Sequence, residues 1–341
     1  MSSEPRVSVL LPVHDAREHL DDAIESIERQ SFADFEVVAV DDGSTDGSAD
    51  LLDAWSRRDD RVRWISSHRR GLVGALNLAL AAARAPLVAR MDADDRCDAR
   101  RLELQVALLD RKREVTVASC LIRHFPDSQV AEGFRHYERW LNSLVTHEEI
   151  WRDRFIESPV PHPSVMARRA ALLAVGGYRD VGWPEDYDLW LRLAARGARF
   201  EKVPETLLLW RDHAGRLTRT DPRYAVERFL ACKAHHLTQG PLLGADGVLL
   251  WGAGQTGRRL SKHLARRGAP LAAFLDIDER KIGRTLRGLP IHPVDDLPRL
   301  LSAPGRTTVL AAVSSRGARE LIRQRLDGLG LVETRDYWCA A

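Results

Sequence analysis

The residues best suited to chemistry stand in two acidic clusters. The first, Met91-Asp92-Ala93-Asp94-Asp95, follows the short apolar run Ala85–Ala89, which predicts a buried strand. Carboxylates crowded just past the end of a strand repel one another, so their spacing indicates a cation held between them. Hard oxygen ligands suit Mg²⁺ or Mn²⁺, and these ions commonly hold the phosphates of a bound nucleotide.

The second cluster, Pro184-Glu185-Asp186-Tyr187-Asp188, opens a predicted helix that Gly197 ends. A carboxylate at this place could serve as a base. A simpler explanation is an acidic helix N-terminus, worth roughly 0.3–1 kcal/mol through the helix dipole. That explanation needs one acid, whereas this cluster has three. A metal-held diphosphate leaving group and a nearby base are the parts needed to transfer a sugar from a nucleotide.

Strands and helices alternate ahead of the first cluster. Strands are predicted at residues 7–13, 35–40, 62–65 and 87–90, and helices at 16–30, around 51–55 and at 72–83. We therefore predict an α/β fold with a mostly parallel sheet and right-handed crossovers. Ligands of such sheets lie beyond the carboxyl ends of the strands, where Asp42 and the first acidic cluster both fall.

The composition narrows the class of protein. A chain of 341 residues allows two domains, and the formal net charge of +2 argues against a dedicated nucleic-acid binder. The four cysteines have no metal-ligand or thioredoxin spacing, which indicates reduced thiols. The N-terminus lacks the apolar core of a signal peptide, and no apolar run approaches the roughly 20 residues that span a bilayer. We expect a cytoplasmic protein, with peripheral contact at the inner face of the membrane and homo-oligomerisation both left open.

With these elements in place, the chain resembles the family 2 glycosyltransferases of the GT-A fold. A lone Asp-x-Asp motif is weak evidence, but ordered blocks with the family's spacing are strong evidence. The resemblance covers about residues 6–215, and its blocks are Val7–Ala16, Ser31–Asp46, Ala89–Asp95, Gly176–Tyr178 and Glu185–Leu193.

The resemblance implies roles for the first cluster. Asp92 and Asp94 would form the Asp-x-Asp pair, with Asp94 the direct ligand of Mn²⁺ or Mg²⁺. Asp95 would support that ligand or contact the donor sugar. His213, in Trp210-Arg211-Asp212-His213, matches a histidine that the family often has near the metal and diphosphate. An isolated histidine in an Arg-rich segment is ordinarily solvated, so that alternative stays open.

The resemblance also implies residues for the acceptor and the nucleotide. Asp186 would be the general base that deprotonates the acceptor hydroxyl, with Glu185 beside it in contact with substrate. Asp42 would accept a hydrogen bond from the donor base, most simply the uracil imide of a UDP-sugar, and Pro12 is a further substrate-binding candidate. Asp42 could instead stabilise its own turn through backbone amides. The family usually has an aromatic residue and Asn where this chain has His14-Asp15, a departure that bears on base recognition and not on the fold.

A second domain is predicted after Thr238–Gly247, the clearest boundary in the chain. We place a GT-A transferase domain at residues 1–240 and a smaller Rossmann-like domain at 246–341. The smaller domain resembles the N-terminal domains of sugar acyltransferases and nucleotide-sugar dehydratases. No Tyr-x-x-x-Lys pair follows, which argues against dehydrogenase or epimerase chemistry there.

A Gly-x-Gly-x-x-Gly pattern stands at the start of the smaller domain. Gly252, Gly254 and Gly257 lie between a predicted strand and a predicted helix, with Asp276 about 20 residues further on. Such glycines permit close approach of the backbone to a phosphate at a helix N-terminus. The pattern predicts a bound nucleotide or nucleotide-sugar, with glycines kept for packing in an ancillary or dimerising domain as the alternative.

The whole chain therefore predicts an inverting, metal-dependent glycosyltransferase. It would move a sugar from a nucleotide-diphosphate donor to a saccharide or lipid-linked acceptor in surface polysaccharide or glycoconjugate synthesis. A sugar nucleotidyltransferase is one alternative, but such enzymes usually have a glycine-rich loop after the first strand, and Pro12–Ala16 has no glycine. A non-catalytic nucleotide-sugar sensor is another, and the presence of Asp92, Asp94 and Asp186 together argues against it.

Overall fold

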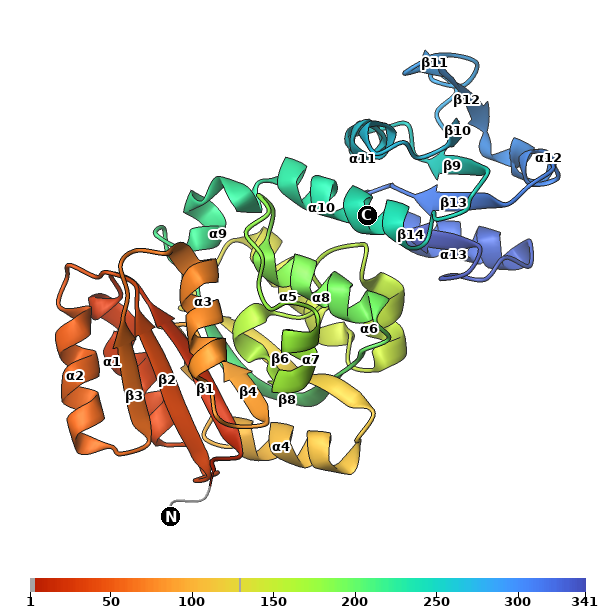
Figure 1. Cartoon of the computed structure of the whole chain (residues 1–341). Coiled ribbons are helices and arrows are strands. Elements are labelled where there is room, and N and C mark those ends of the chain that lie inside the picture. The colour runs from red at the N-terminus through yellow and green to blue at the C-terminus, as the bar shows by residue number, and fades with distance from the viewer. Residues whose placement is uncertain (1–3, 129) are drawn as a thin grey trace. The chain divides into compact units, whose positions relative to one another are not determined.

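The chain forms two compact units, each built around one β-sheet (Figure 1). The computed structural model describes residues 4–128 and 130–341. The first unit includes residues up to Ile150 with Pro159–Val181 and Glu185–Thr220, and the second comprises Trp151–Ser158, Gly182–Pro184 and Asp221–Ala341. Helix α10 (Val226–Gln239) thus groups with the second unit. The expectation that residues 1–240 fold by themselves stays a prediction.

The sheet of the first unit has the strand order β3-β2-β1-β4-β7-β6-β8-β5. Its parallel half contains the strands that the apolar runs predicted, namely β1 (Val7–Val13), β2 (Phe35–Asp41), β3 (Val62–Ser66) and β4 (Leu87–Arg90). Strand β1 pairs in parallel with both β2 and β4. Asp42 follows β2 and the first acidic cluster follows β4, so both lie beyond the same edge of the sheet.

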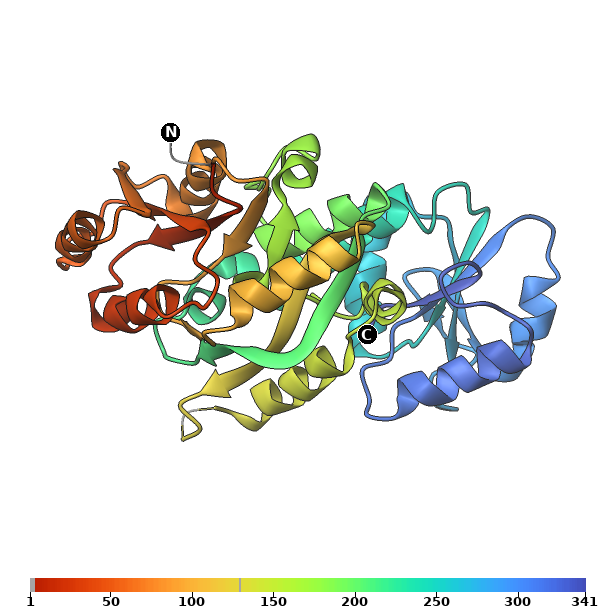
Figure 2. The ribbon, with the colours of Figure 1, turned by 90° about the horizontal axis from the view of Figure 1, so that it is seen from below.

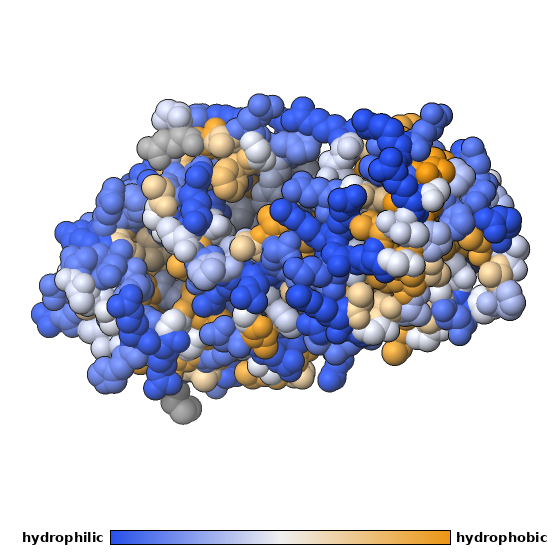
Figure 3. Space-filling view, turned by 90° about the horizontal axis from the view of Figure 1, so that it is seen from above, coloured by the Kyte–Doolittle hydropathy of each residue, from blue (hydrophilic) through white to orange (hydrophobic). Residues whose placement is uncertain are grey.

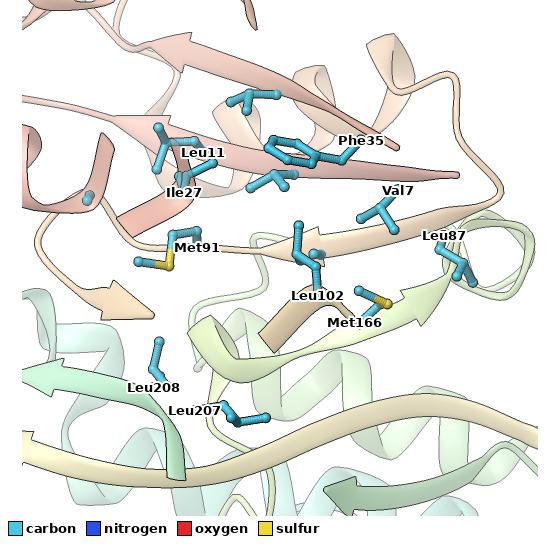
Figure 4. Packing of buried hydrophobic residues seen from close by; sticks show 14 of the residues in the cluster. Val7, Leu11, Ile27, Phe35, Leu87, Met91, Leu102, Met166, Leu207 and Leu208 are labelled. Atoms are coloured by element: carbon cyan, nitrogen blue, oxygen red, sulfur yellow. The ribbon is translucent and has the colours of Figure 1, made fainter. Parts of the chain in front are cut away.

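Helices cover both faces of this parallel half. The buried sides of α1 (Arg17–Glu28), α2 (Ser48–Arg58) and α4 (Arg101–Arg111) share one apolar core with alternate residues of β1. Helix α3 (Gly71–Ala82) packs on β1 and β2 from the opposite face (Figure 1). Figure 4 shows Leu11, Ile27 and Met91 together in the core, which fixes the residue before Asp92 in place.

The other half of the sheet is mixed. The long strands β6 (Val115–Phe125) and β8 (Arg199–Arg211) are parallel to each other, whereas β7 (Met166–Arg168) is antiparallel to both β4 and β6. The short β5 (Arg96–Cys97) pairs antiparallel with β8. The alternation that predicted a parallel sheet is thus confined to the first four strands. Figure 2 shows α4 lying along β6 and β8.

Short helices complete the first unit. The helix predicted after the second acidic cluster is α8 (Glu185–Ala195), and Gly197 follows it with a φ of +78°, a left-handed conformation that lets the chain leave the helix. The others are α5 (Glu132–Ser143), α7 (Arg169–Ala174) and α9 (Leu217–Thr220), with a 3₁₀ turn at His162–Ser164. Helix α6 (His147–Asp153) begins in the first unit and its last three residues group with the second.

The second unit has a six-stranded sheet in the order β11-β12-β10-β9-β13-β14. The predicted βαβ unit is β9 (Gly247–Trp251), α11 (Gln255–Arg266) and β10 (Leu271–Asp276). The sheet is extended in parallel by β12 (Leu289–Pro293), β13 (Thr307–Ala311) and β14 (Tyr337–Cys339). An antiparallel strand, β11 (Thr285–Leu286), forms one edge. The remaining α-helices of this unit in the described chain are α12 (Leu297–Leu301) and α13 (Ala318–Gly328). The arrangement is Rossmann-like, as predicted.

No helix in the described ranges is long and apolar enough to cross a membrane. Figure 3 shows a face on which hydrophilic residues predominate, with apolar residues in smaller patches.

Candidate active site

The three aspartates of the first cluster converge beyond β4. One carboxylate oxygen from each of Asp92, Asp94 and Asp95 lies within 4.8 Å of the others. Met91 anchors them, because it is 1% exposed and its sulfur accepts an N–H from Arg101 at 3.4 Å. The sequence thus positions the acids by alternating them with buried apolar residues at the end of a strand.

Each aspartate has a different partner. The Arg90 guanidinium forms a close ion pair with Asp92, and the His213 ring nitrogen Nε2 lies 2.8 Å from Asp94 Oδ2. The backbone N–H of Arg211 donates to Asp95 Oδ1 at 2.7 Å, and its Nε donates to the Asp94 carbonyl at 2.6 Å. The end of β8 therefore packs against the cluster and brings His213 to it.

The pKa values of the clustered aspartates are shifted in different directions. Burial raises the pKa of Asp95 well above its usual range, and the neighbouring Asp94 and Asp92 raise it further. Burial acts to raise the pKa of Asp94 too, but the hydrogen bond and charge of His213, the charge of Arg216 and a backbone hydrogen bond together lower it. The second oxygen of Asp95, Oδ2, is buried without a hydrogen-bond partner in the described part of the chain. Crowded carboxylate oxygens, one of them unpaired, with a nearby imidazole fit a divalent cation such as Mn²⁺ or Mg²⁺.

Glu185 and Asp186 of the second cluster differ in burial, and the third acid, Asp188, is buried as Glu185 is. Glu185 is 1% exposed and its Oε1 lies 3.8 Å from Nδ1 of the buried His162. Asp186 is half-buried, and its Oδ1 accepts the N–H of Tyr187 at 2.7 Å. Asp186 is therefore the more accessible of the two.

Tyr178 lies where the charges of both clusters reach it, and it was not singled out from the sequence. Its hydroxyl lies 3.0 Å from His162 Nε2. Burial raises the pKa of Tyr178 and the charge of Arg90 acts to lower it. The charges of Glu185, Asp186 and Asp92 raise it, so acids of both clusters act on this one phenol. The only sequence signal was its place in the Gly176–Tyr178 block of the family resemblance.

The nucleotide-side candidates lie at the ends of β1 and β2. Asp42 accepts N–H groups of Arg70 at 2.6 Å and Gly71 at 2.7 Å, one on each carboxylate oxygen, so it fastens the start of α3. These amides belong to the start of α3 and not to the turn after β2, so they are not the contacts that the turn-stabilising alternative predicted for Asp42. Pro12 is buried in β1, opposite Val40. The atypical Asp15 accepts the N–H of Thr45 at 2.7 Å and thus binds the loop after β2.

A cavity of about 470 Å³ lies in the second unit at the carboxyl ends of β9 and β10, and Gly252, Gly254 and Asp276 line it. A Cβ on Gly257 would meet the Gly252 carbonyl oxygen at 1.8 Å, and one on Gly252 would come within 2.9 Å of the Ala312 oxygen. A Cβ on Gly254 would meet nothing within 4 Å. Two of the glycines are thus required for packing, and Gly254 faces open space. Asp276 closes the turn by accepting the N–H of Ala253 at 2.9 Å.

Two family models match this chain. The one described as Glycosyl transferase family 2 matches residues 8–176, and the one described as CoA binding domain matches residues 245–329. The chain is 30% identical over 242 residues to EpsE of Bacillus subtilis (strain 168), which is named as a glycosyltransferase, covering 68% of this chain and 84% of that protein. It is 27% identical over 207 residues to the UDP-Gal:alpha-D-GlcNAc-diphosphoundecaprenol beta-1,3-galactosyltransferase of Escherichia coli, covering 60% and 73%.

Solved structures share the fold. TarS 1-349 of S. aureus in complex with UDP-GlcNAc has a TM-score of 0.56 at 16% identity, over 77% of this chain and 72% of that chain. The mannosyltransferase PcManGT from Pyrobaculum calidifontis, in complex with GDP-Man and Mn2+, has a TM-score of 0.50 at 24% identity, over 70% and 63%. Because the relative EpsE matches over most of both chains and the fold agrees, this chain is a glycosyltransferase and belongs to glycosyltransferase family 2.

Proposed function

We propose that the first unit is an inverting, metal-dependent transferase. It moves a sugar from a nucleotide-diphosphate donor, most simply a UDP-sugar, to an acceptor hydroxyl in polysaccharide or glycoconjugate synthesis. The observation that carries the proposal is the set of three converging aspartates and His213, with the buried oxygen of Asp95 left unpaired. The UDP-Gal donor and lipid-linked acceptor of one relative, and the GDP-Man and Mn2+ of one structural neighbour, support it.

The arrangement assigns a task to each acid. Asp94, with Asp92 and His213, would hold a divalent cation, which when bound supplies positive charge to the donor diphosphate. Asp95 supports these ligands or contacts the donor sugar. Asp186 takes the proton of the acceptor hydroxyl while the acceptor oxygen bonds to the anomeric carbon. The bond from that carbon to the diphosphate breaks, and its electron pair leaves with the nucleoside diphosphate. A single displacement of this kind inverts the anomeric centre and needs one base.

The nucleotide base would lie at the ends of β1 and β2. Each oxygen of Asp42 accepts one amide N–H, and a carboxylate oxygen has a second lone pair that can accept the imide N–H of uracil. The α3 contacts of Asp42 hold it in a fixed orientation for that task, with Pro12 in the neighbouring strand. The lipid-linked acceptor of the E. coli relative suggests a peripheral membrane position for this chain as well.

Replacing Asp94 with alanine tests the metal site. We expect Asp94→Ala to abolish metal-dependent binding of UDP while the fold stays intact, because the metal loses the ligand that His213 orients. Calorimetry with UDP and Mn²⁺ measures the affinity, and circular dichroism checks the fold. Asp98→Ala, which removes an exposed acid just past the cluster, is the matched control and should bind as the unaltered protein does. Unchanged affinity and metal dependence in Asp94→Ala would disprove the assignment.

For the second unit we propose a bound nucleotide or nucleotide-containing cofactor. The cavity of about 470 Å³ is large enough for a small ligand, and the open space at Gly254 adjoins the N-terminus of α11. Ile277 and Leu321 also line the cavity and are 78% and 67% exposed, which suits the flat apolar face of a base.

A larger side chain at Gly254 tests this site. Gly254 has a φ of −79°, which valine tolerates, so Gly254→Val should fold and fill the space that a phosphate needs. The Asp94→Ala protein serves as the background, because its transferase site no longer binds nucleotide with metal. Thermal shift with UDP, ADP and coenzyme A should show stabilisation that Gly254→Val removes and that Gly328→Val, at another open glycine, leaves unchanged. Equal stabilisation of all variants would mean that no part of the bound ligand occupies the space beside Gly254.

A further inference from the structure

Arg216 is a buried cation without a hydrogen-bond partner on one of its nitrogens. It lies in the loop between β8 and α9 and is 7% exposed. Its Nη1 contacts no acceptor in the part of the chain that the structure describes. A buried charged donor left unpaired is costly, so a protein keeps one where something else pairs with it.

Arg216 follows His213 by three residues, and His213 contacts the first acidic cluster. The backbone N–H of Arg216 donates to the His213 carbonyl at 3.2 Å, and His213 contacts Asp94. The guanidinium lies over the ring of Trp210, 4.0 Å from the centroid, which sets its position and orientation. Trp210 is the residue before Arg211, whose backbone binds Asp95. The segment 210–216 therefore contacts Asp94 and Asp95 through Arg211 and His213, and Arg216 is held to the same segment.

Neighbouring arginines form ion pairs with carboxylates, and Arg216 does not among the described residues. Arg90 pairs with Asp92, Arg211 with Asp22, and Arg219 makes bonds of 2.9 and 2.7 Å to both oxygens of Asp212. Arg216 makes no ion pair with any described carboxylate, although its charge acts against burial to favour the ionised forms of the clustered aspartates. A preformed planar donor of this kind is suited to phosphate oxygens.

We infer that Arg216 is a catalytic residue that donates its Nη1–H to the donor diphosphate and stabilises the charge developing on the leaving phosphate. The inference rests on the proposed transferase function of this site. When the bond from the anomeric carbon to the phosphate oxygen breaks, the electron pair stays on that oxygen, and the nucleoside diphosphate gains a negative charge. The acceptor proton goes to Asp186, and the guanidinium stays protonated throughout. Arg216 therefore binds the product more strongly than the substrate.

The test compares two ligands that differ in this charge. UDP carries one more negative charge on its terminal phosphate than UDP-galactose or UDP-GlcNAc. Calorimetry with Mn²⁺ on the full chain should show that Arg216→Gln weakens UDP binding by roughly tenfold or more and weakens UDP-sugar binding less. Turnover should fall by about 10²-fold, with a smaller change in the donor KM.

Arg219→Gln is the matched control, since it removes the same charge three residues further on in the same segment, from a side chain already paired with Asp212. It should leave the ratio of the two affinities unchanged. Arg216→Met covers the case in which the glutamine variant does not fold, because methionine fills the space over Trp210 without an unpaired polar group. Equal weakening of both ligands in the Arg216 variants, or the same shift in Arg219→Gln, would overturn the inference. Absence of metal-dependent binding in the unaltered protein would instead overturn the proposed function.

Discussion

Accessibility separates Asp186 from its neighbours at the residue scale. Glu185 is turned inward toward His162, whereas Asp186 stays half-exposed at the start of α8 with one oxygen on the Tyr187 amide. An acceptor can reach the outward carboxylate without disturbing the buried pair.

Asp186→Asn should therefore separate binding from chemistry. We expect UDP affinity with Mn²⁺ to stay within about twofold of that of the unaltered protein, since the change is isosteric and leaves the metal-ligand candidates in place. Turnover should fall about 10²–10⁴-fold, because an amide cannot take the acceptor proton. Steady-state kinetics and calorimetry on the same preparations make the comparison. Near-normal turnover would transfer the role to Glu185 or Asp188.

At the element scale, the loop from Val175 to Tyr178 is fastened from two helices. Asn77 of α3 bonds to both the backbone N–H and the carbonyl of Tyr178, at 3.0 and 2.9 Å. Arg192 of α8 donates to the carbonyls of Val175 and Gly177, both at 2.8 Å. The loop thus ties the helix that bears Asp186 to the parallel half of the sheet.

Gly177 is the residue on which this fastening depends. It has a φ of +63°, and a Cβ there would come within 2.6 Å of the Asn77 side-chain oxygen. Gly177→Ala should lower the free energy of unfolding by more than the roughly 1–2 kcal/mol of left-handed strain alone, and should reduce turnover. Gly197→Ala shares the left-handed conformation without a contact within 4 Å, so it measures the strain by itself. Equal destabilisation of both proteins in urea denaturation would show that Asn77 yields without cost.

Local patterns predicted the strands and helices that carry the acids, because period and turn chemistry act over a few residues. The strands β1 to β4 and the βαβ unit of the second domain were found in this way. Asn77 and Tyr178 are 101 positions apart, and nothing in either local sequence indicates the other. Arg216 was hidden among many arginines, and its unpaired nitrogen is a property of the folded chain. His213 was selected by family resemblance alone.

At the scale of the whole molecule, removing residues 241–341 tests the predicted division of labour. All transferase residues named above precede residue 221, so we expect residues 1–240 to fold and to bind UDP with Mn²⁺. Thermal stability should fall, because the truncation removes Arg323 from the buried Asp153 and Ala340 from Lys233. Differential scanning calorimetry and UDP titration measure the two effects. Arg323→Gln in the full chain should reproduce part of the stability loss with unchanged UDP affinity. A truncated protein that folds without binding UDP would show that the C-terminal domain completes the site.

Helix α3 contacts both Asp42 and the loop that precedes the second acidic cluster. Its first residues bind Asp42, and Asn77 further along holds Tyr178. A rigid helix transmits displacement along its length, so nucleotide binding that fixes Asp42 also restricts the loop that leads to Asp186. The two substrates are then thermodynamically linked. Under the proposed roles of Asp42 and Asp186, any change that the bound donor makes in the affinity for the acceptor is matched by an equal change that the acceptor makes in the affinity for the donor.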